Sequence, residues 1–211
     1  MKSKSSSEIR EIFLKFFEKN DHLIHPPSSL IPANDPTLLL TNSGMAQFKN
    51  YFSGEAEPPK KRITSSQKCF RSTDIDEVGD STHLTLFEML GNFSFGDYFK
   101  EEACQMALNL MVNELDFDIE KIFITVHNDD LETKKIWLKL GIPDEKISFF
   151  GDSDNWWGPA GDEGPCGPCS ELHYYIGKEN INKKIKDNDN KWGPNIHEDF
   201  VELYNLVFTQ F

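Results

Sequence analysis

The sequence has 211 residues, enough for one sizeable domain or two small ones, and its 38% hydrophobic content with 17 Phe and 4 Trp excludes a disordered chain. Its 22 Lys and Arg against 35 Asp and Glu give a net charge of −13, which argues against a chain that grips a nucleic-acid backbone by charge alone. No apolar run approaches the roughly 18 residues of a membrane helix, and the N-terminal MKSKSSSEIREIF lacks the apolar centre of a signal peptide, so we predict a soluble cytoplasmic protein.

The first predicted element is an amphipathic helix over residues 5–19. Ser5 and Glu8 have the spacing of a capping box, in which each side chain bonds the backbone N–H of the other residue. Apolar residues then recur at helical spacing and define one face that is predicted to pack on a sheet. These residues are Ile9, Ile12, Phe13, Phe16 and Phe17.

A chain punctuated by prolines follows this helix. Residues 22–36 contain four prolines, which predicts loop and extended backbone. Residues 38–40 are three consecutive leucines and form a candidate strand. We predict a turn over residues 41–45, a short helix over 47–52, and a charged linker over 55–62.

Residues 67–99, QKCFRSTDIDEVGDSTHLTLFEMLGNFSFGDYF, are two apolar segments joined by a polar, acidic loop. Arg71 ends the first segment, and the second segment is rich in aromatic residues. The planar fork of an arginine holds phosphate or carboxylate, an aromatic ring stacks on a purine, and acidic residues hold the Mg²⁺ that accompanies a triphosphate. The stretch therefore predicts a binding site for a nucleoside triphosphate.

The rest of the chain alternates between helical and strand patterns. The predicted elements are a helix over 101–115, a strand over 121–127, a helix over 129–140, a strand over 146–150 and a strand over 200–211. Between the last two, the polar residues 178–191, KENINKKIKDNDNK, predict a mobile surface loop. Interleaved helices and strands without internal repeats predict a mixed, α+β class.

Residues 154–171, DNWWGPAGDEGPCGPCSE, place two tryptophans beside a turn rich in Gly and Pro. Indole surface next to polar groups suits a small apolar ligand. Packing of both Trp156 and Trp157 in the core is the structural alternative.

Cys166 and Cys169 form a CxxC pair within this stretch, and four cysteines in all are too few and too unevenly placed for a secreted disulfide framework. A redox pair of this spacing opens a helix after a strand, whereas this pair follows a turn and precedes a candidate strand. A structural zinc site needs four Cys or His ligands. His173 is a third candidate beside Cys166 and Cys169. No fourth ligand lies nearby in the sequence, and the remaining candidate, His197, is distant.

The last predicted strand alternates, with Val201, Leu203, Asn205 and Val207 on one face. An amide among apolar residues on a core-facing strand needs a hydrogen-bond partner, because an unpaired buried amide is costly. The partner of Asn205 is either the backbone or the carboxylate or amine of a substrate.

Several phrases of the sequence agree in order and spacing with one family. SSLIPANDPTLLLTNSGMAQFKNYF, with Pro36, resembles the motif 1 region of class II aminoacyl-tRNA synthetases, and residues 67–99 resemble motif 2. FEMLGNFSFGDYF, DNWW and NLVF are similar to phrases of alanyl-tRNA synthetases. The resemblance implies an antiparallel sheet flanked by helices, incomplete at the C-terminus, with residues 1–211 as the N-terminal portion of the catalytic domain.

The resemblance also implies roles for individual residues. Arg71 would bridge the α-phosphate of ATP and the carboxylate of alanine, Phe87 would stack on adenine in a pattern with His83, and Asp74 or Glu77 would contact the adenine edge or Mg²⁺. The implied ATP-binding set is Arg71, Glu77, His83, Phe87 and Met89. The implied amino-acid-binding set is Met45, Arg71, Trp157, Asn205 and Val207, in which Asn205 orients the amino acid and Val207 limits its size.

The implied reaction is ATP-dependent activation of alanine to alanyl-adenylate, followed by transfer to tRNA(Ala). The third class II motif, the tRNA-recognition and editing domains, and the zinc expected in the editing domain would lie beyond Phe211, so we expect a truncated piece that is incomplete alone. The oligomeric state is left open. The alternative hypothesis is a catalytically inactive, synthetase-like protein that binds a nucleotide or a partner.

Overall fold

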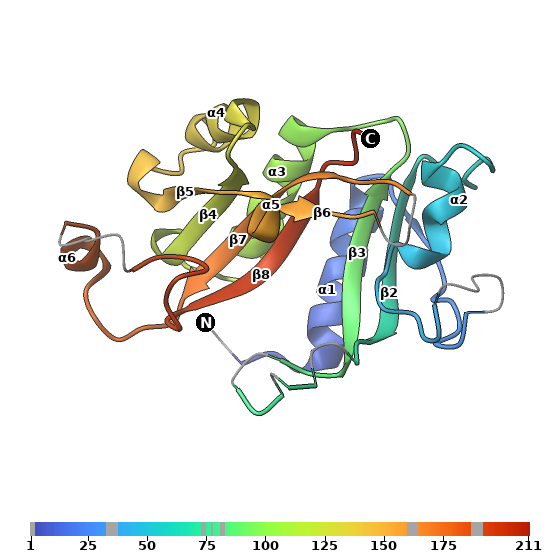
Figure 1. Ribbon diagram of the computed structural model, residues 1–211, viewed down its shortest axis with the longest axis horizontal. Coiled ribbons are helices and arrows are strands. Elements are labelled where there is room, and N and C mark those ends of the chain that lie inside the picture. The colour runs from blue at the N-terminus through green and yellow to red at the C-terminus, as the bar shows by residue number, and fades with distance from the viewer. Residues whose placement is uncertain are drawn as a thin grey trace. The chain divides into compact units, whose positions relative to one another are not determined.

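The computed structural model describes two compact units, Lys2–Asp97 and Tyr98–Phe211, and each is considered by itself (Figure 1). The described residues are 3–32, 38–72, 75–76, 78–80, 83–159, 164–186 and 192–211. Within these residues, no helix combines the length and the apolar character needed to cross a membrane.

The N-terminal unit is a small sheet with one long helix. Its elements are α1 (Ser6–Lys19), β1 (Leu23–Ile24), η1 (Ala46–Phe48), α2 (Lys49–Phe52), β2 (Arg62–Phe70) and β3 (Leu86–Ser94). The strand order is β1-β2-β3, with β1 parallel and β3 antiparallel to β2. The two predicted apolar segments of residues 67–99 thus lie in the arms of one β-hairpin, which Figure 1 shows as the paired β2 and β3.

The predicted capping box begins α1. The backbone N–H of Glu8 donates to Ser5 Oγ at 3.3 Å, and the backbone N–H of Ser5 donates to Glu8 Oε2 at 2.7 Å. The buried face is carried by Phe13, Phe16 and Phe17, whereas Ile9 remains 37% exposed, so the buried stripe is shorter than predicted.

The two faces of the β-hairpin have different neighbours. Arg10 of α1 forms an ion pair with Glu88 of β3 at 2.5 Å, so α1 lies against the face that carries Glu88. Phe87 and Met89 point to the opposite face, because successive strand residues alternate. On that face Gly44 and Phe48 contact Met89 and Phe93, so the segment from Thr41 to Phe52 lies over it.

The predicted strand at Leu38–Leu40 is wrong. This segment joins no sheet, and Leu39 is 93% exposed. The chain here makes isolated contacts in place of a ladder: the N–H of Thr41 donates to the carbonyl of Leu30, and the N–H of Phe70 donates to the carbonyl of Thr41. A strand needs a continuous row of backbone partners, which these two bonds do not supply.

The C-terminal unit contains a five-stranded sheet. Its elements are α3 (Lys100–Asn109), η2 (Leu110–Glu114), η3 (Ile119–Lys121), β4 (Ile122–His127), α4 (Leu131–Lys139), η4 (Asp144–Lys146), β5 (Ile147–Phe150), α5 (Asp152–Asn155), β6 (Trp156–Trp157), β7 (Gly167–Tyr175), α6 (Ile181–Lys186) and β8 (Phe200–Val207). The order is β5-β4-β7-β6, and β8 also pairs with β7. β4 and β8 pair with the same residues of β7, so they occupy its two edges.

The sheet of this unit has a helical face and a second face that carries polar groups. Trp137 of α4 donates its indole N–H to Ser170 of β7 at 2.9 Å, which places α4 on the helical face. Asn155 of α5 donates to Thr125 of β4 at 2.9 Å, on the second face. In Figure 1, α5 lies in front of β7 and α3 lies behind the sheet.

The predicted elements from residue 101 to residue 150 are confirmed, as is the α+β class with an antiparallel-rich sheet flanked by helices. Two details differ. The expected surface loop contains the helix α6, and residues 187–191 lie outside the described residues. A bulge opposite Leu172 and His173 interrupts the alternation of β8, so that Val201 pairs with Tyr174 and does not share the face of Asn205.

Candidate active site

Arg71 lies directly after β2 and is held by three contacts. Its backbone N–H donates to the carbonyl of Thr85 at 2.9 Å, which extends the β2–β3 pairing by one residue. Its Nε donates to the carbonyl of Asn42 at 3.1 Å, and its Cζ lies 5.3 Å from the centre of the Phe87 ring. Within the described part of the chain, its terminal nitrogens have no hydrogen-bond partner, so the fork remains available for an anion.

Phe87 and Met89 follow each other on the same face of β3. Phe87 is directly opposite Cys69, and Met89 is directly opposite Gln67. The sulfur of Met89 accepts a hydrogen bond from the N–H of Gly44 at 3.1 Å. The next residue, Met45, is 8% exposed.

The residues Met45, Arg71, Phe87 and Met89 therefore come from one hairpin and the segment that lies over it, and we call them the Arg71 set. They combine a cation with apolar and aromatic surface. Such a combination is suited to binding a nucleotide, because phosphate needs the cation and a base needs a flat apolar partner.

Of the residues predicted to act in the loop between β2 and β3, the structure describes only His83. His83 is described and exposed: its Nδ1 lies 2.5 Å from the Asp80 carboxylate, which also accepts from the His83 backbone N–H at 2.7 Å. Asp74 and Glu77, predicted to contact adenine or Mg²⁺, lie outside the described residues, and so does Pro36 of the first motif.

Trp157 and Val207 lie at one end of the sheet in the C-terminal unit. Trp157 is directly opposite Gly167, and Val207 is directly opposite Cys169. Side chains of directly opposite residues share a face, so Trp157 and Val207 are on the same side of the sheet. A Cβ at Gly167 would lie 2.0 Å from the carbonyl oxygen of Phe208, so only glycine admits this close approach of the chain after β8.

Asn205 bonds to a buried carboxylate rather than to the backbone. Its Nδ2 donates to Glu171 Oε1 at 3.0 Å. The other oxygen of Glu171, Oε2, lies 3.0 Å from Thr125 Oγ1 and 3.1 Å from His173 Nε2. Thr125 in turn accepts from Asn155, as described above. We call these five residues the Glu171 set.

Four residues of the Glu171 set, Thr125, Asn155, Glu171 and His173, are each 4% exposed or less, whereas Asn205 is exposed. The sequence pattern indicated Asn205 but not Glu171, Thr125 or Asn155. A signal was present: a Glu within SELHYY, a segment that is otherwise typical of a buried strand, needs partners that satisfy its charge. The register then places Thr125, Glu171 and Asn205 in one row across three strands.

The three candidate zinc ligands do not converge. Cys169 and His173 are four residues apart on β7, or roughly 13 Å, whereas two ligands of one zinc ion lie within about 4–5 Å of each other. Burial, together with the charges of Glu171 and Glu202, raises the pKa of the Cys169 thiol to about 12, which disfavours a thiolate for metal binding or redox chemistry. In the described parts of the chain, no three His, Cys, Asp or Glu side chains are grouped to hold a metal ion.

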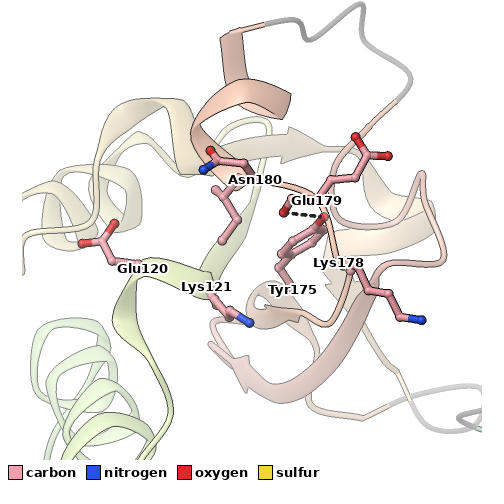
Figure 2. A pocket seen from close by; sticks show the side chains of 8 residues that line it. Glu120, Lys121, Tyr175, Lys178, Glu179 and Asn180 are labelled. Carbon is pink, nitrogen blue, oxygen red and sulfur yellow. Dashed lines mark hydrogen bonds between the residues drawn. The ribbon is translucent and has the colours of Figure 1, made fainter.

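A pocket of about 390 Å³ lies elsewhere in the C-terminal unit, between the start of β4 and the segment before α6. Figure 2 shows that Glu120, Lys121, Tyr175 and Glu179 line it, with the Tyr175 hydroxyl donating to the Glu179 carbonyl at 3.3 Å. None of the predicted site residues lines this pocket, so it is separate from the candidate active site.

Comparisons with known proteins agree with these features. Residues 8–211 match the family described as tRNA synthetases class II (A). Similar curated proteins include an alanine–tRNA ligase of Leptospira interrogans, 52% identical, and one of Dehalococcoides mccartyi, 53% identical. One of Rubrobacter xylanophilus is 48% identical.

These alignments cover 98–100% of the chain but only 22–25% of each of these three relatives. The chain thus spans about a quarter of the length of the curated relatives that it matches. The family match begins within the first turn of α1, extends to the end of β8 and includes every predicted site residue. The chain belongs to the family of class II tRNA synthetases.

Proposed function

We propose that this chain supplies part of the aminoacylation machinery of an alanine–tRNA ligase, which activates alanine with ATP and transfers it to tRNA(Ala). The observation that carries the proposal is an identity of 48–53% to alanine–tRNA ligases over essentially the whole chain. The expected partners are alanine, ATP with its Mg²⁺, and tRNA(Ala), in the cytoplasm.

In the first step the carboxylate oxygen of alanine attacks the α-phosphorus of ATP. A bond forms between that oxygen and phosphorus, and the bond from phosphorus to the bridging oxygen breaks, which releases pyrophosphate and leaves alanyl-adenylate. This displacement needs positioning and charge stabilisation rather than a protein nucleophile. In the second step the alanyl group passes to the terminal ribose of the tRNA.

We assign the binding of ATP to the Arg71 set. The terminal nitrogens of Arg71 would hold α-phosphate oxygens and stabilise the charge that develops there. Its Nε is bonded to Asn42 and its Cζ lies near Phe87, so the side chain is held before ATP binds. Phe87 would stack on adenine with the side of its ring that does not face Arg71. The described residues offer no protein cage for Mg²⁺, which would enter with the triphosphate.

We assign the binding of alanine to the face of the C-terminal sheet that carries Trp157, Asn205 and Val207. Val207 and Trp157 would surround the methyl side chain, and Asn205 would bind a polar group of the amino acid. A valine wall discriminates between small side chains only weakly, by about 1–3 kcal/mol per methylene. Correction by a separate editing activity would therefore be expected of the natural protein.

The test is alanine-dependent exchange of pyrophosphate into ATP, measured on the natural full-length protein that carries this sequence. Exchange that depends on alanine and is lost on Arg71→Ala supports the proposal. Equal exchange with and without alanine, or an Arg71→Ala variant as active as the parent, contradicts it. A folded protein that binds ATP without any exchange would instead favour the inactive, synthetase-like alternative, for which the described residues give no specific support.

A further inference from the structure

Glu171 is the centre of a polar network within the C-terminal sheet. It is 4% exposed, and three side chains lie within hydrogen-bond distance of its carboxylate: Asn205 at 3.0 Å from Oε1, and Thr125 at 3.0 Å and His173 at 3.1 Å from Oε2. These partners come from β7 itself and from the strand on each side of it. The carboxylate is thus held from three strands and has little freedom to rotate.

The chemistry of a carboxylate fixes the orientation of its partners. An ionised carboxylate only accepts hydrogen bonds, so Asn205 must turn its NH₂ group toward Glu171. The Thr125 hydroxyl accepts from Asn155 and therefore gives its single hydrogen to Glu171. His173 must carry its proton on Nε2 for the same reason.

The orientation of Asn205 decides what it offers to a ligand. Its NH₂ group is committed to Glu171, while its Oδ1 has no hydrogen-bond partner among the described residues. Asn205 is itself exposed, although the carboxylate that holds it is buried. An unpartnered amide oxygen on an exposed residue accepts hydrogen bonds, so it suits an ammonium group and repels a carboxylate.

We propose that Glu171 is a positioning residue, which holds the Asn205 amide so that its oxygen receives the ammonium group of the amino acid. This inference rests on the proposed function and sharpens it, because the sequence left open whether Asn205 meets the carboxylate or the amine. The negative charge of Glu171 behind Asn205 reinforces the preference for a cation.

The first test compares Glu171→Ala and the isosteric Glu171→Gln with the control Glu145→Gln in the natural full-length protein. Glu145 is an exposed carboxylate of the same unit, in η4, outside the network. In pyrophosphate exchange, we expect Glu171→Ala to raise the KM for alanine about ten-fold or more, with the KM for ATP unchanged, because an oriented bond to a charged group is lost. Glu171→Gln keeps one acceptor for Asn205 and should restore part of the affinity.

The second test uses two analogues of alanine as competitive inhibitors. Alaninol keeps the ammonium group and lacks the carboxylate, whereas propionate keeps the carboxylate and lacks the ammonium group. We expect Glu171→Ala to weaken inhibition by alaninol by the same factor as the KM for alanine and to leave inhibition by propionate unchanged. Weaker inhibition by propionate alone would overturn the assigned orientation of Asn205.

The third test probes the contact between Asn205 and Glu171 by NMR and does not depend on catalysis. The side-chain NH₂ resonances of Asn205 in a ¹H–¹⁵N spectrum should shift in Glu171→Ala and stay in place in Glu145→Gln. Unchanged resonances in both variants overturn the proposal. An unsubstituted protein without alanine-dependent exchange contradicts the proposed function alone, whereas an active parent whose Glu171 variants match the control contradicts this inference alone.

Discussion

The Arg71 set and the Glu171 set differ in how their polar groups are occupied. The terminal nitrogens of Arg71 have no hydrogen-bond partner among the described residues, and its two side-chain contacts are a backbone carbonyl and an aromatic ring. Glu171 is buried with three partners, whereas Asn205 is an exposed residue whose Oδ1 has no hydrogen-bond partner among the described residues.

The difference suits the two ligands that we propose, ATP and alanine. A triphosphate is highly charged, so it would bind strongly to the terminal nitrogens of an arginine that is already fixed through its Nε. Alanine is small and offers few contacts, so its site must be preorganised by a shell of fixed hydrogen bonds. Substitutions in the Arg71 set should therefore act through ATP, and those in the Glu171 set through the amino acid.

The largest expected effect comes from Arg71. Arg71→Ala should reduce the rate of alanine-dependent exchange about 10²–10³-fold, as the loss of a charge-stabilising donor does. Arg71→Lys should restore little, because lysine lacks the planar fork. Arg10→Ala is the control: it removes a guanidinium of the same unit that pairs with Glu88 on the opposite face, and its rate should stay near that of the parent.

Phe87 should have the next largest effect. Phe87→Leu keeps apolar surface but removes stacking, so the KM for ATP should rise about ten-fold while the KM for alanine stays constant. Phe52→Leu serves as the control, because it changes another half-buried phenylalanine of the same unit, one that packs on Phe95. A rise in the KM for alanine with Phe87→Leu would contradict the assignment of ATP to the Arg71 set and of alanine to the Glu171 set.

Val207 tests the size limit of the amino-acid site. Val207→Ala should improve the kcat/KM for 2-aminobutyrate relative to alanine by about ten-fold, because a longer side chain gains room. Val201→Ala serves as the control, since the bulge places Val201 opposite Tyr174 and away from the face of Asn205. Equal selectivity in both variants would remove Val207 from the site.

The smallest effect concerns the scaffold of the C-terminal unit. Burial raises the pKa of the Asp130 carboxyl, but hydrogen bonds from Lys100 and Thr133 outweigh burial and lower it below its ordinary value. A carboxyl whose pKa is lowered in the folded state stabilises the protein above about pH 4. This stabilisation is lost as the pH falls through the pKa of the folded state. The free energy of unfolding, measured by urea titration from pH 6 to pH 3, should therefore fall less steeply in Asp130→Asn than in the parent.

The control for this titration is Asp129→Asn, which changes the neighbouring exposed carboxyl. It should reproduce the pH dependence of the parent. Asn at position 130 remains a good N-cap for α4, so the comparison isolates the charge of the carboxylate from the cap. If the free energy of unfolding of the parent and of Asp130→Asn changed in parallel with pH, the buried pair of Lys100 and Asp130 would not contribute to acid sensitivity.

Local patterns predicted most of the elements and Arg71, whereas the family resemblance supplied Met45, Phe87 and Met89. The capping box, the helix over 101–115 and the hairpin around Arg71 depend on residues that are close in sequence or on strong alternation. Pairing across strands could not be predicted in the same way. Glu171, Thr125 and Asn155 are far apart in sequence and meet only through the register of β4, β7 and α5.

The errors have similar causes. Three consecutive leucines at 38–40 have the composition of a strand but no ladder partner, and this depends on the rest of the unit. The bulge in β8 changes which residues share a face, and nothing in FVELYNLVF marks its position. The zinc candidates Cys166, Cys169 and His173 already lacked a fourth ligand in the sequence, and the extended backbone of β7 also separates Cys169 from His173.

The most direct test of the division between ATP and alanine is one kinetic experiment on two variants. Pyrophosphate exchange is measured with ATP and alanine varied independently, for Phe87→Leu and Glu171→Ala. The account predicts that Phe87→Leu raises only the KM for ATP and that Glu171→Ala raises only the KM for alanine. A variant that raises both KM values would contradict it. So would the reverse result, in which Phe87→Leu raises the KM for alanine and Glu171→Ala raises the KM for ATP.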